Sequence, residues 1–187
     1  VWINYSGVGV NWSSASNWDP TYLAPPDNPM SQFPPGNSLG DINFWPLTAD
    51  VPLSYVDAPW TIGMIYWQGN RNVTLAGADL TLQQATGGSS LTLANAAIAI
   101  GNNNDNNRTF NITNNIIFDD SAYAYDPTLY TKAILQRTGN SKVNFYGHVS
   151  QPGPHGAIAL RTGSTINMYG GLSASVTPDL TDTYNGY

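Results

Sequence analysis

One serine lies in a motif that can carry nucleophilic catalysis. Ser38 is the central residue of positions 36–40 (GNSLG), which match the G-x-S-x-G pattern of a nucleophile elbow. Such an elbow needs a strand before the serine and a helix after it. Two prolines precede the motif instead, and residues 41–44 have the pattern of a strand. We therefore expect no nucleophile at Ser38.

The two histidines of the chain lie seven residues apart and could act as a base or as metal ligands. His148 and His155 flank the segment Gln-Pro-Gly-Pro at 151–154, which is typical of a turn. An internal repeat, described below, places His148 opposite Gly171, where one repeat unit leaves its strand. We interpret His148 as a turn residue.

Paired carboxylates of the glycosidase type can come only from Asp, because the chain has no Glu. Asp119 and Asp120 are the only adjacent pair, with Lys132 and Arg137 as the nearby basic candidates. The β-helix polysaccharide hydrolases and lyases are the enzyme precedent, but they need more coils and basic residues beside their Asp cluster. We expect no enzyme activity.

The sequence offers no strong metal site. The run 101–107 (GNNNDNN) supplies side-chain oxygens of the kind that Ca²⁺ prefers, but it lacks the EF-hand spacing. Asn also stabilises turns through its own backbone, which accounts for the run without a cation. Thiolate sites are excluded because the chain has no Cys. We expect no metal and no cofactor.

The aromatic residues allow two interpretations, a glycan-binding surface or a cap. All six Trp lie before residue 70. Flat aromatic faces can stack on sugars, and we name Trp60 and Trp67 as possible glycan-binding residues. An open-ended stack of strands must also cover its apolar end to prevent association. We assign this capping role to the other four: Trp2, Trp12, Trp18 and Trp45.

Composition excludes several classes of protein. Charged residues make up 10% of the chain and the net charge is -6, which argues against nucleic-acid binding and coiled coils. The 18 Gly and 13 Pro interrupt helices, whereas 41% hydrophobic residues are too many for a disordered chain. No apolar run approaches the roughly 20 residues that cross a bilayer. We expect a folded, β-rich protein without membrane insertion.

Short apolar triplets dominate the chain after residue 70. Each has two apolar residues around a small or polar one, which predicts a short strand with its middle residue facing outward. Gly, Asn, Ser and Pro turns separate them. The triplets are 73–75, 80–82, 91–93, 98–100, 110–112, 143–145, 158–160 and 166–168.

An internal repeat indicates how these strands are arranged. Residues 134–150 align with 158–173 at eight identical positions, including Asn144/Asn167 and Tyr146/Tyr169. A unit of 23 or 24 residues with such short strands cannot bury its apolar face alone and must stack on a copy of itself. We predict an all-β fold, a right-handed parallel β-helix, in which Val143 stacks on Ile166. The alternative is two similar hairpins of a β-sandwich.

Three regions follow from this reading: a Trp- and Pro-rich cap at 1–70, β-helix coils at 71–175 and an extended tail at 176–187. A series of short motifs runs through the N-terminal part of the chain: Trp2, Asn11-Trp12, residues 17–20 (NWDP), 34–36 (PPG), 40–44 (GDINF), 60–63 (WTIG) and 73–77 (VTLAG). In this order they resemble exported bacterial modules of the autotransporter type, in which a Trp-rich cap runs into a parallel β-helix. The resemblance implies a surface-displayed, adhesive or structural β-helix without a shared catalytic set.

These observations predict a non-enzymatic structural or adhesive protein of the cell exterior. The chain starts at Val1 without a signal-peptide pattern, so we expect a mature secreted chain. The polar tail is a poor seal for the end of a β-helix, and an unsealed end can propagate as a filament of copies of the chain. A fragment whose next coils are missing explains the tail equally well. A glycan-binding module is the alternative function, with surface polysaccharide as its partner. The predicted self-assembly residues are Val176, Leu180, Tyr184 and Tyr187.

Overall fold

The computed structural model describes most of the predicted strands. The described residues are 4–8, 10–18, 42–44, 47–67, 71–83, 97–100, 107–119, 133–136, 141–152, 159–161 and 165–174. Within these stretches the chain forms β-strands and one three-residue 3-10 helix, η1 (Ala15–Asn17). The all-β prediction is therefore confirmed for this part of the chain.

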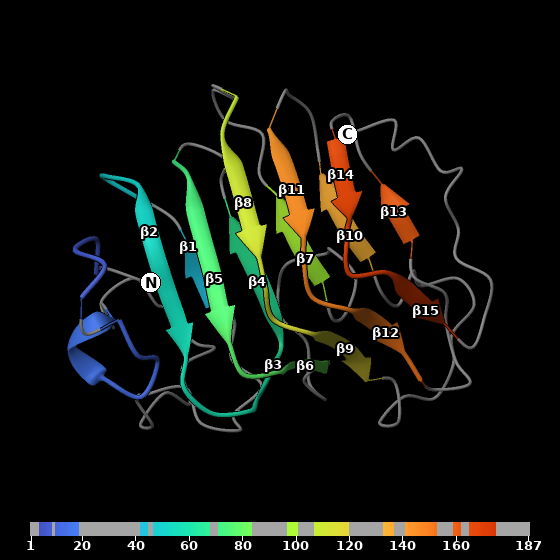
Figure 1. Ribbon diagram of the computed structural model, residues 1–187, viewed down its shortest axis with the longest axis horizontal. Coiled ribbons are helices and arrows are strands. Elements are labelled where there is room, and N and C mark those ends of the chain that lie inside the picture. Colours follow the sequence, from blue (N-terminus) through green and yellow to red (C-terminus); the bar gives the residue numbers. More distant parts are fainter. Residues whose placement is uncertain are drawn as a thin grey trace, which may run out of the picture.

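The strands of the described residues form three five-stranded sheets, and Figure 1 shows the second of them with its strands side by side. The first sheet contains β1 (Ile42–Phe44), β4 (Met64–Trp67), β7 (Ala97–Ile100), β10 (Ala133–Gln136) and β13 (Ala159–Arg161). The second contains β2 (Val51–Val56), β5 (Val73–Gly77), β8 (Thr109–Ile112), β11 (Lys142–Phe145) and β14 (Thr165–Met168). The third contains β3 (Trp60–Ile62), β6 (Leu80–Gln83), β9 (Ile116–Asp119), β12 (Val149–Gln151) and β15 (Leu172–Ala174).

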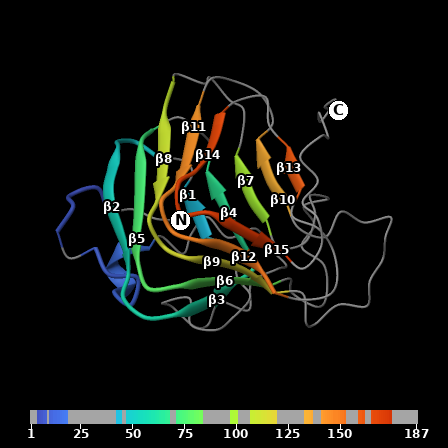
Figure 2. The same cartoon turned by 45° about the vertical axis from the view of Figure 1, so that its right-hand side comes forward.

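Each of the strands β1 to β12 pairs in parallel with the strand three places further along the chain. The described part of the chain thus visits the first, second and third sheet in turn, and it does so five times. We call each set of three consecutive strands a layer. In Figure 2 the strands of the third sheet run beneath those of the second, with a turn at the corner between them. Every layer therefore has the same corner, and residues at that corner lie above one another.

The register predicted from the repeat is confirmed. Val143 pairs with Ile166 and Phe145 with Met168, and the two strands are parallel. All strand pairs between the described residues are parallel, so the hairpins of the sandwich alternative are absent from this part of the chain. Residues with the same role in the repeat become neighbours across layers.

The sheets extend further towards the N-terminus than the predicted boundary near residue 70. β1 pairs with β4, β2 with β5 and β3 with β6, so residues 42–62 contribute a complete layer. Phe44 of this layer and Trp67 of the next point into the interior, where both pack against Phe110. The change in composition near residue 70 therefore marks a change in side-chain size, because it does not coincide with the end of the sheets.

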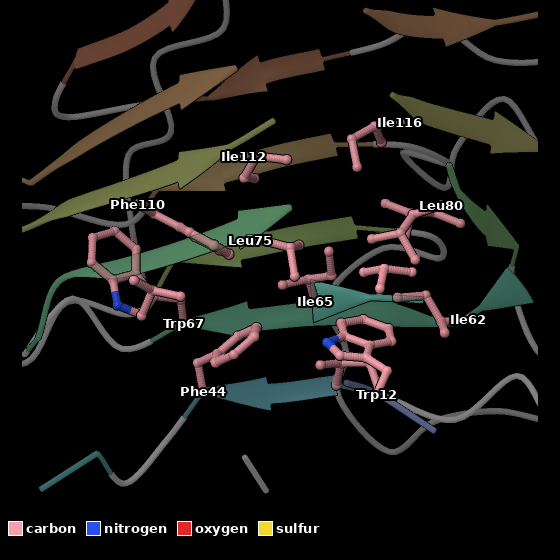
Figure 3. Packing of buried hydrophobic residues seen from close by; sticks show 14 of the residues in the cluster. Trp12, Phe44, Ile62, Ile65, Trp67, Leu75, Leu80, Phe110, Ile112 and Ile116 are labelled. Carbon is pink, nitrogen blue, oxygen red and sulfur yellow. The ribbon is translucent and has the colours of Figure 1, made fainter. Parts of the chain in front are cut away.

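The core fills the space between the three sheets (Figure 3). In β5, β8 and β11 the two apolar residues of each predicted triplet are buried, whereas the middle residue is partly exposed. Fully burying one such apolar side chain contributes about 1.5–3 kcal/mol. The columns Val73–Phe110–Val143 and Leu75–Ile112–Phe145 cross three layers. The in-out-in pattern is confirmed for these triplets.

Candidate functional surface

The two ends of the layered stack differ in how well they are covered. Val143, Phe145 and Val149 in the fourth layer are 0% exposed. Their partners in the fifth layer, Ile166, Met168 and Leu172, are only partly buried and pack against the core from one side. Each of these three side chains contacts the fourth layer below it, but no described layer lies above it. The fifth layer thus presents a partly exposed apolar surface.

At the other end, an N-terminal segment covers the edge of β2. The amide of Trp12 donates to the carbonyl of Tyr55 at 2.8 Å, and the amide of Tyr55 donates to the carbonyl of Val10 at 2.9 Å. Asn11 thereby forms a parallel bridge to Tyr55. Because both backbone groups of Tyr55 are satisfied, β2 is no longer an open edge at this position.

Trp12 and Trp18 lie beside this bridge. Trp12 is fully buried, and its Nε1 donates to Ser54 Oγ at 2.8 Å. The Trp18 Nε1 donates to the Trp12 carbonyl at 2.9 Å, and the two rings pack edge to face with centroids 5.4 Å apart. Both indole rings therefore pack against the first layer, at the end where the cap is predicted.

The glycan-binding prediction for Trp60 and Trp67 is wrong, because both rings are inside the protein. Trp60 is 8% exposed and packs edge to face on Trp12, with centroids 6.0 Å apart. Trp67 is 0% exposed, and its Nε1 donates to the carbonyl of Arg71 at 3.0 Å. Neither indole can offer a flat face to a sugar. Their position in the inward-facing register of β3 and β4 is the physical reason.

A ladder of asparagine amides runs along the outer face of the second sheet. Asn144 Nδ2 donates to Asn111 Oδ1 at 2.9 Å, and Asn167 Nδ2 donates to Asn144 Oδ1 at 2.8 Å. Every amide has the same orientation, so the carbonyl oxygen of each residue faces the next layer. The ladder ends at Asn167, whose Oδ1 accepts no hydrogen bond from the described residues.

Two tyrosines stack beside this ladder. The rings of Tyr146 and Tyr169 lie 5.0 Å apart between centroids, at 14° between planes. Tyr146 is 51% exposed and Tyr169 is 65% exposed. Both follow directly after a strand of the second sheet, so they occupy the same place in successive layers. This stack is the largest exposed aromatic feature of the described residues.

Glycines at the corner fix where the next strand starts. A Cβ on Gly147 would lie 2.0 Å from the carbonyl oxygen of Asn114, and one on Gly170 would lie 2.2 Å from that of Gly147. Successive layers therefore touch through bare backbone at this corner. The close contact brings Tyr169 directly over Tyr146, which explains why the repeat contains the pair Tyr-Gly in both copies.

His148 has a structural role at the same corner, as predicted. Its Nδ1 lies 3.0 Å from the carbonyl oxygen of Gly170, and its Nε2 lies 2.9 Å from Ser173 Oγ. Because a carbonyl can only accept, Nδ1 donates to Gly170, and Nε2 forms a second hydrogen bond with the serine hydroxyl. The amide of His148 donates to Asn115 Oδ1 at 2.9 Å. The side chain thus links the fourth layer to the fifth.

Asp50 is held at the opposite corner by Asn72. The Asn72 amide donates to Asp50 Oδ1 and its Nδ2 donates to Oδ2, both at 2.9 Å. Desolvation raises the pKa of Asp50, but the hydrogen bonds from Asn72 and the charges of Arg108 and Arg71 outweigh it and hold this pKa below its ordinary value. The carboxylate is therefore a structural acceptor between two layers.

The catalytic and metal candidates gain no support from the described residues. No three His, Cys, Asp or Glu side chains converge there in a way that could hold a metal ion. None of the helical structure in the described ranges is long and apolar enough to cross a membrane. Asp119 ends β9. The following predicted residues lie outside the described ones: Trp2, Ser38, Trp45, residues 101–106, Asp120, Lys132, Arg137, His155, Val176, Leu180, Tyr184 and Tyr187.

The strongest surface feature of the described residues is thus the fifth layer with its amide ladder and tyrosine stack. The sequence contained a signal for both, because Asn144/Asn167 and Tyr146/Tyr169 are identical in the repeat. Comparisons of the chain with protein-family models, with curated proteins and with solved structures find no match.

Proposed function

We propose that this chain is a non-enzymatic structural or adhesive protein of the cell exterior that associates with copies of itself into a filament or matrix. Its scaffold is a right-handed parallel β-helix with an aromatic cap at the N-terminal end. Three stacks of parallel strands, visited in turn, support the helical path. The right hand follows from the general rule that about 98% of connections between parallel strands are right-handed.

The difference between the two ends carries the proposal. Val10, Trp12 and Trp18 cover the first layer, whereas Ile166 and Met168 of the fifth layer are only partly buried. Ile166 and Met168 occupy positions that are fully buried in the fourth layer. Because they are only partly buried, they gain less stabilisation than full burial would give. Contact with a second copy through this end would restore it.

The same architecture accounts for an exported role. The Asn-, Thr- and Ser-rich surface, the absence of Cys and the resemblance to autotransporter-type modules support a secreted bacterial surface protein. The partners are copies of the chain, with surface polysaccharide as a second possible partner. No nucleic acid, membrane insertion, cofactor or catalytic step enters the proposal.

Sedimentation velocity and negative-stain electron microscopy over a range of protein concentrations test self-association. The wild-type chain is expected to form fibres, and Met168→Asp is expected to prevent them, because it places a charge on the partly exposed apolar surface. Thr165→Asp is the matched control, since Thr165 is an exposed residue of the same strand. Far-UV circular dichroism establishes that both variants fold. A wild-type chain that stays monomeric at high concentration would contradict the proposal.

A glycan-binding module is the second candidate, and the exposed tyrosine stack favours it. Tyr146 and Tyr169 present exposed aromatic rings, and flat aromatic faces can stack on sugar rings. Glycan-array binding that is lost in Tyr169→Ala, and retained when the exposed Tyr55 is changed to Ala, would support this role. Absence of binding to any glycan would exclude it.

A further inference from the structure

The edge of β14 is the last edge of the second sheet in the described chain. β14 pairs with β11 on one side and has no strand partner among the described residues on the other. Parallel strands alternate between bonds to each neighbour, so half of the backbone groups of β14 face outward. Such an edge binds an added extended segment through main-chain hydrogen bonds.

Side chains at this edge determine which segment fits. The Oδ1 atom of Asn167 faces outward as the unused acceptor of the amide ladder. One face of the Tyr169 ring stacks on Tyr146, and the ring remains 65% exposed. The matching strand therefore carries an Asn above Asn167 and a Tyr above Tyr169, two residues later. A residue before that Asn would stand above the apolar Ile166.

The sequence contains this pattern three times. Asn followed two residues later by Tyr occurs at Asn144, at Asn167 and at Asn185, and nowhere else in the 187 residues. The first two form the fourth and fifth layers. The third is the segment 184–187 (YNGY), in which the residue before Asn185 is again apolar. It lies outside the described residues.

The spacing of the chain argues that a second copy supplies this segment. Among the described strands, residues that pair between successive layers are at least 20 positions apart, as in Trp60 with Leu80, and Asn144 and Asn167 are 23 apart. Asn185 follows Asn167 by only 18 positions. The chain is therefore shorter here than every described layer would need to return to its own edge.

We infer that segment 184–187 of a second copy adds to the edge of β14 as a parallel strand. Asn185 Nδ2 donates to Asn167 Oδ1, and the Tyr187 ring stacks on the exposed face of Tyr169. Tyr184 covers Ile166, and Gly186 lies above Met168. This inference rests on the proposed self-association and names the contact that produces it. It also gives the predicted self-assembly residues Tyr184 and Tyr187 a specific position.

A complementation experiment with full-length variants tests the contact. Asn167→Ala damages the edge and leaves the segment intact, whereas Asn185→Ala does the reverse. Each variant alone is expected to associate at least about tenfold more weakly than wild type by sedimentation velocity. The substitution removes one hydrogen bond across the contact and leaves the other partner of that bond unpaired. An equimolar mixture is expected to form a one-to-one complex, because it restores one complete contact. Tyr55→Ala is the control, since this exposed tyrosine lies at the covered end of the same sheet.

The possible failures are distinct. If both asparagine variants associate as wild type does, another surface mediates association, so the inference falls and the proposed function stands. If wild type is monomeric at every concentration, both fall. If the two variants are weakened but their mixture forms no complex, the segment binds within its own chain and the inference is overturned. A closed dimer that depends on both asparagines supports the inference and excludes the filament.

Discussion

Removal of Asn144 from the amide ladder should cost about twice as much stability as removal of Asn167. Asn144 donates one hydrogen bond and accepts another, at 2.9 and 2.8 Å, whereas Asn167 makes only the second of these. At about 1 kcal/mol for each net hydrogen bond, Asn144→Ala is expected to lower the free energy of unfolding by about 2 kcal/mol and Asn167→Ala by about 1 kcal/mol. The alanine variants share the same loss of side chain, so they control for each other.

A variant whose stability depends on pH tests the direction of the hydrogen bonds in the ladder. In Asn144→Asp the introduced carboxylate can accept from Asn167 but faces the acceptor Asn111 Oδ1, to which only the protonated form can donate. The folded pKa of the new carboxyl is therefore raised above its unfolded value. The destabilisation is expected in full above the folded pKa, and it should diminish as the pH falls through that value towards the unfolded pKa of about 3.9.

Urea unfolding followed by circular dichroism measures these differences in the free energy of unfolding. The comparison uses variants whose unfolding free energy depends equally on urea concentration, that is, variants with equal m-values. The comparison is made at a low protein concentration to keep association out of the free energy. Equal costs for Asn144→Ala and Asn167→Ala would refute a continuous ladder. A pH-independent cost in Asn144→Asp would show that the amide of Asn144 does not donate to Asn111.

Three further predictions concern the corners and the cap. Gly147→Ala should lower the free energy of unfolding by more than about 3 kcal/mol in chemical unfolding, because its Cβ would lie 2.0 Å from a backbone oxygen. Gly171→Ala should cost only about 1–2 kcal/mol in the same assay, because Gly171 has a positive φ but the nearest atom to its Cβ would be 3.5 Å away. Trp12→Ala should cost about 3–5 kcal/mol in thermal and chemical unfolding, since the ring is fully buried between other aromatic residues. Asp50→Asn should be less stable than wild type above the unfolded pKa of about 3.9, and the difference should disappear as the pH falls through the lower folded pKa; a difference that grows towards acid would contradict the assigned direction.

The last two layers were predictable because their repeat is almost free of insertions. Val143 and Ile166 are 23 residues apart, and the identical residues around them align the two strands without ambiguity. Between earlier layers the same column is interrupted by longer connections: Val73 and Phe110 are 37 residues apart, and Phe110 and Val143 are 33 apart. The varying spacing hides the period, so only the short triplets indicated those strands.

The predictions that differ from the structure concern residues whose type does not distinguish the interior of the protein from its surface. Trp60 and Trp67 are as suitable for a sugar-binding surface as for a core, and only the register of β3 and β4 places them inward. The same cause produced the boundary near residue 70. Large aromatic residues in the first layers suggested a separate cap, whereas Phe44 and Trp67 fill the interior of the same sheets as the later, smaller residues.

Hydrogen exchange at residues 165–169 is the most direct test of the open edge. These amides include the outward-facing backbone groups of β14, to which the added strand would bind. Exchange in the wild-type chain is expected to slow as the protein concentration rises, and Asn185→Ala is expected to need at least about tenfold higher concentration for the same slowing. Exchange in the wild-type chain that is the same at every concentration would contradict association through β14.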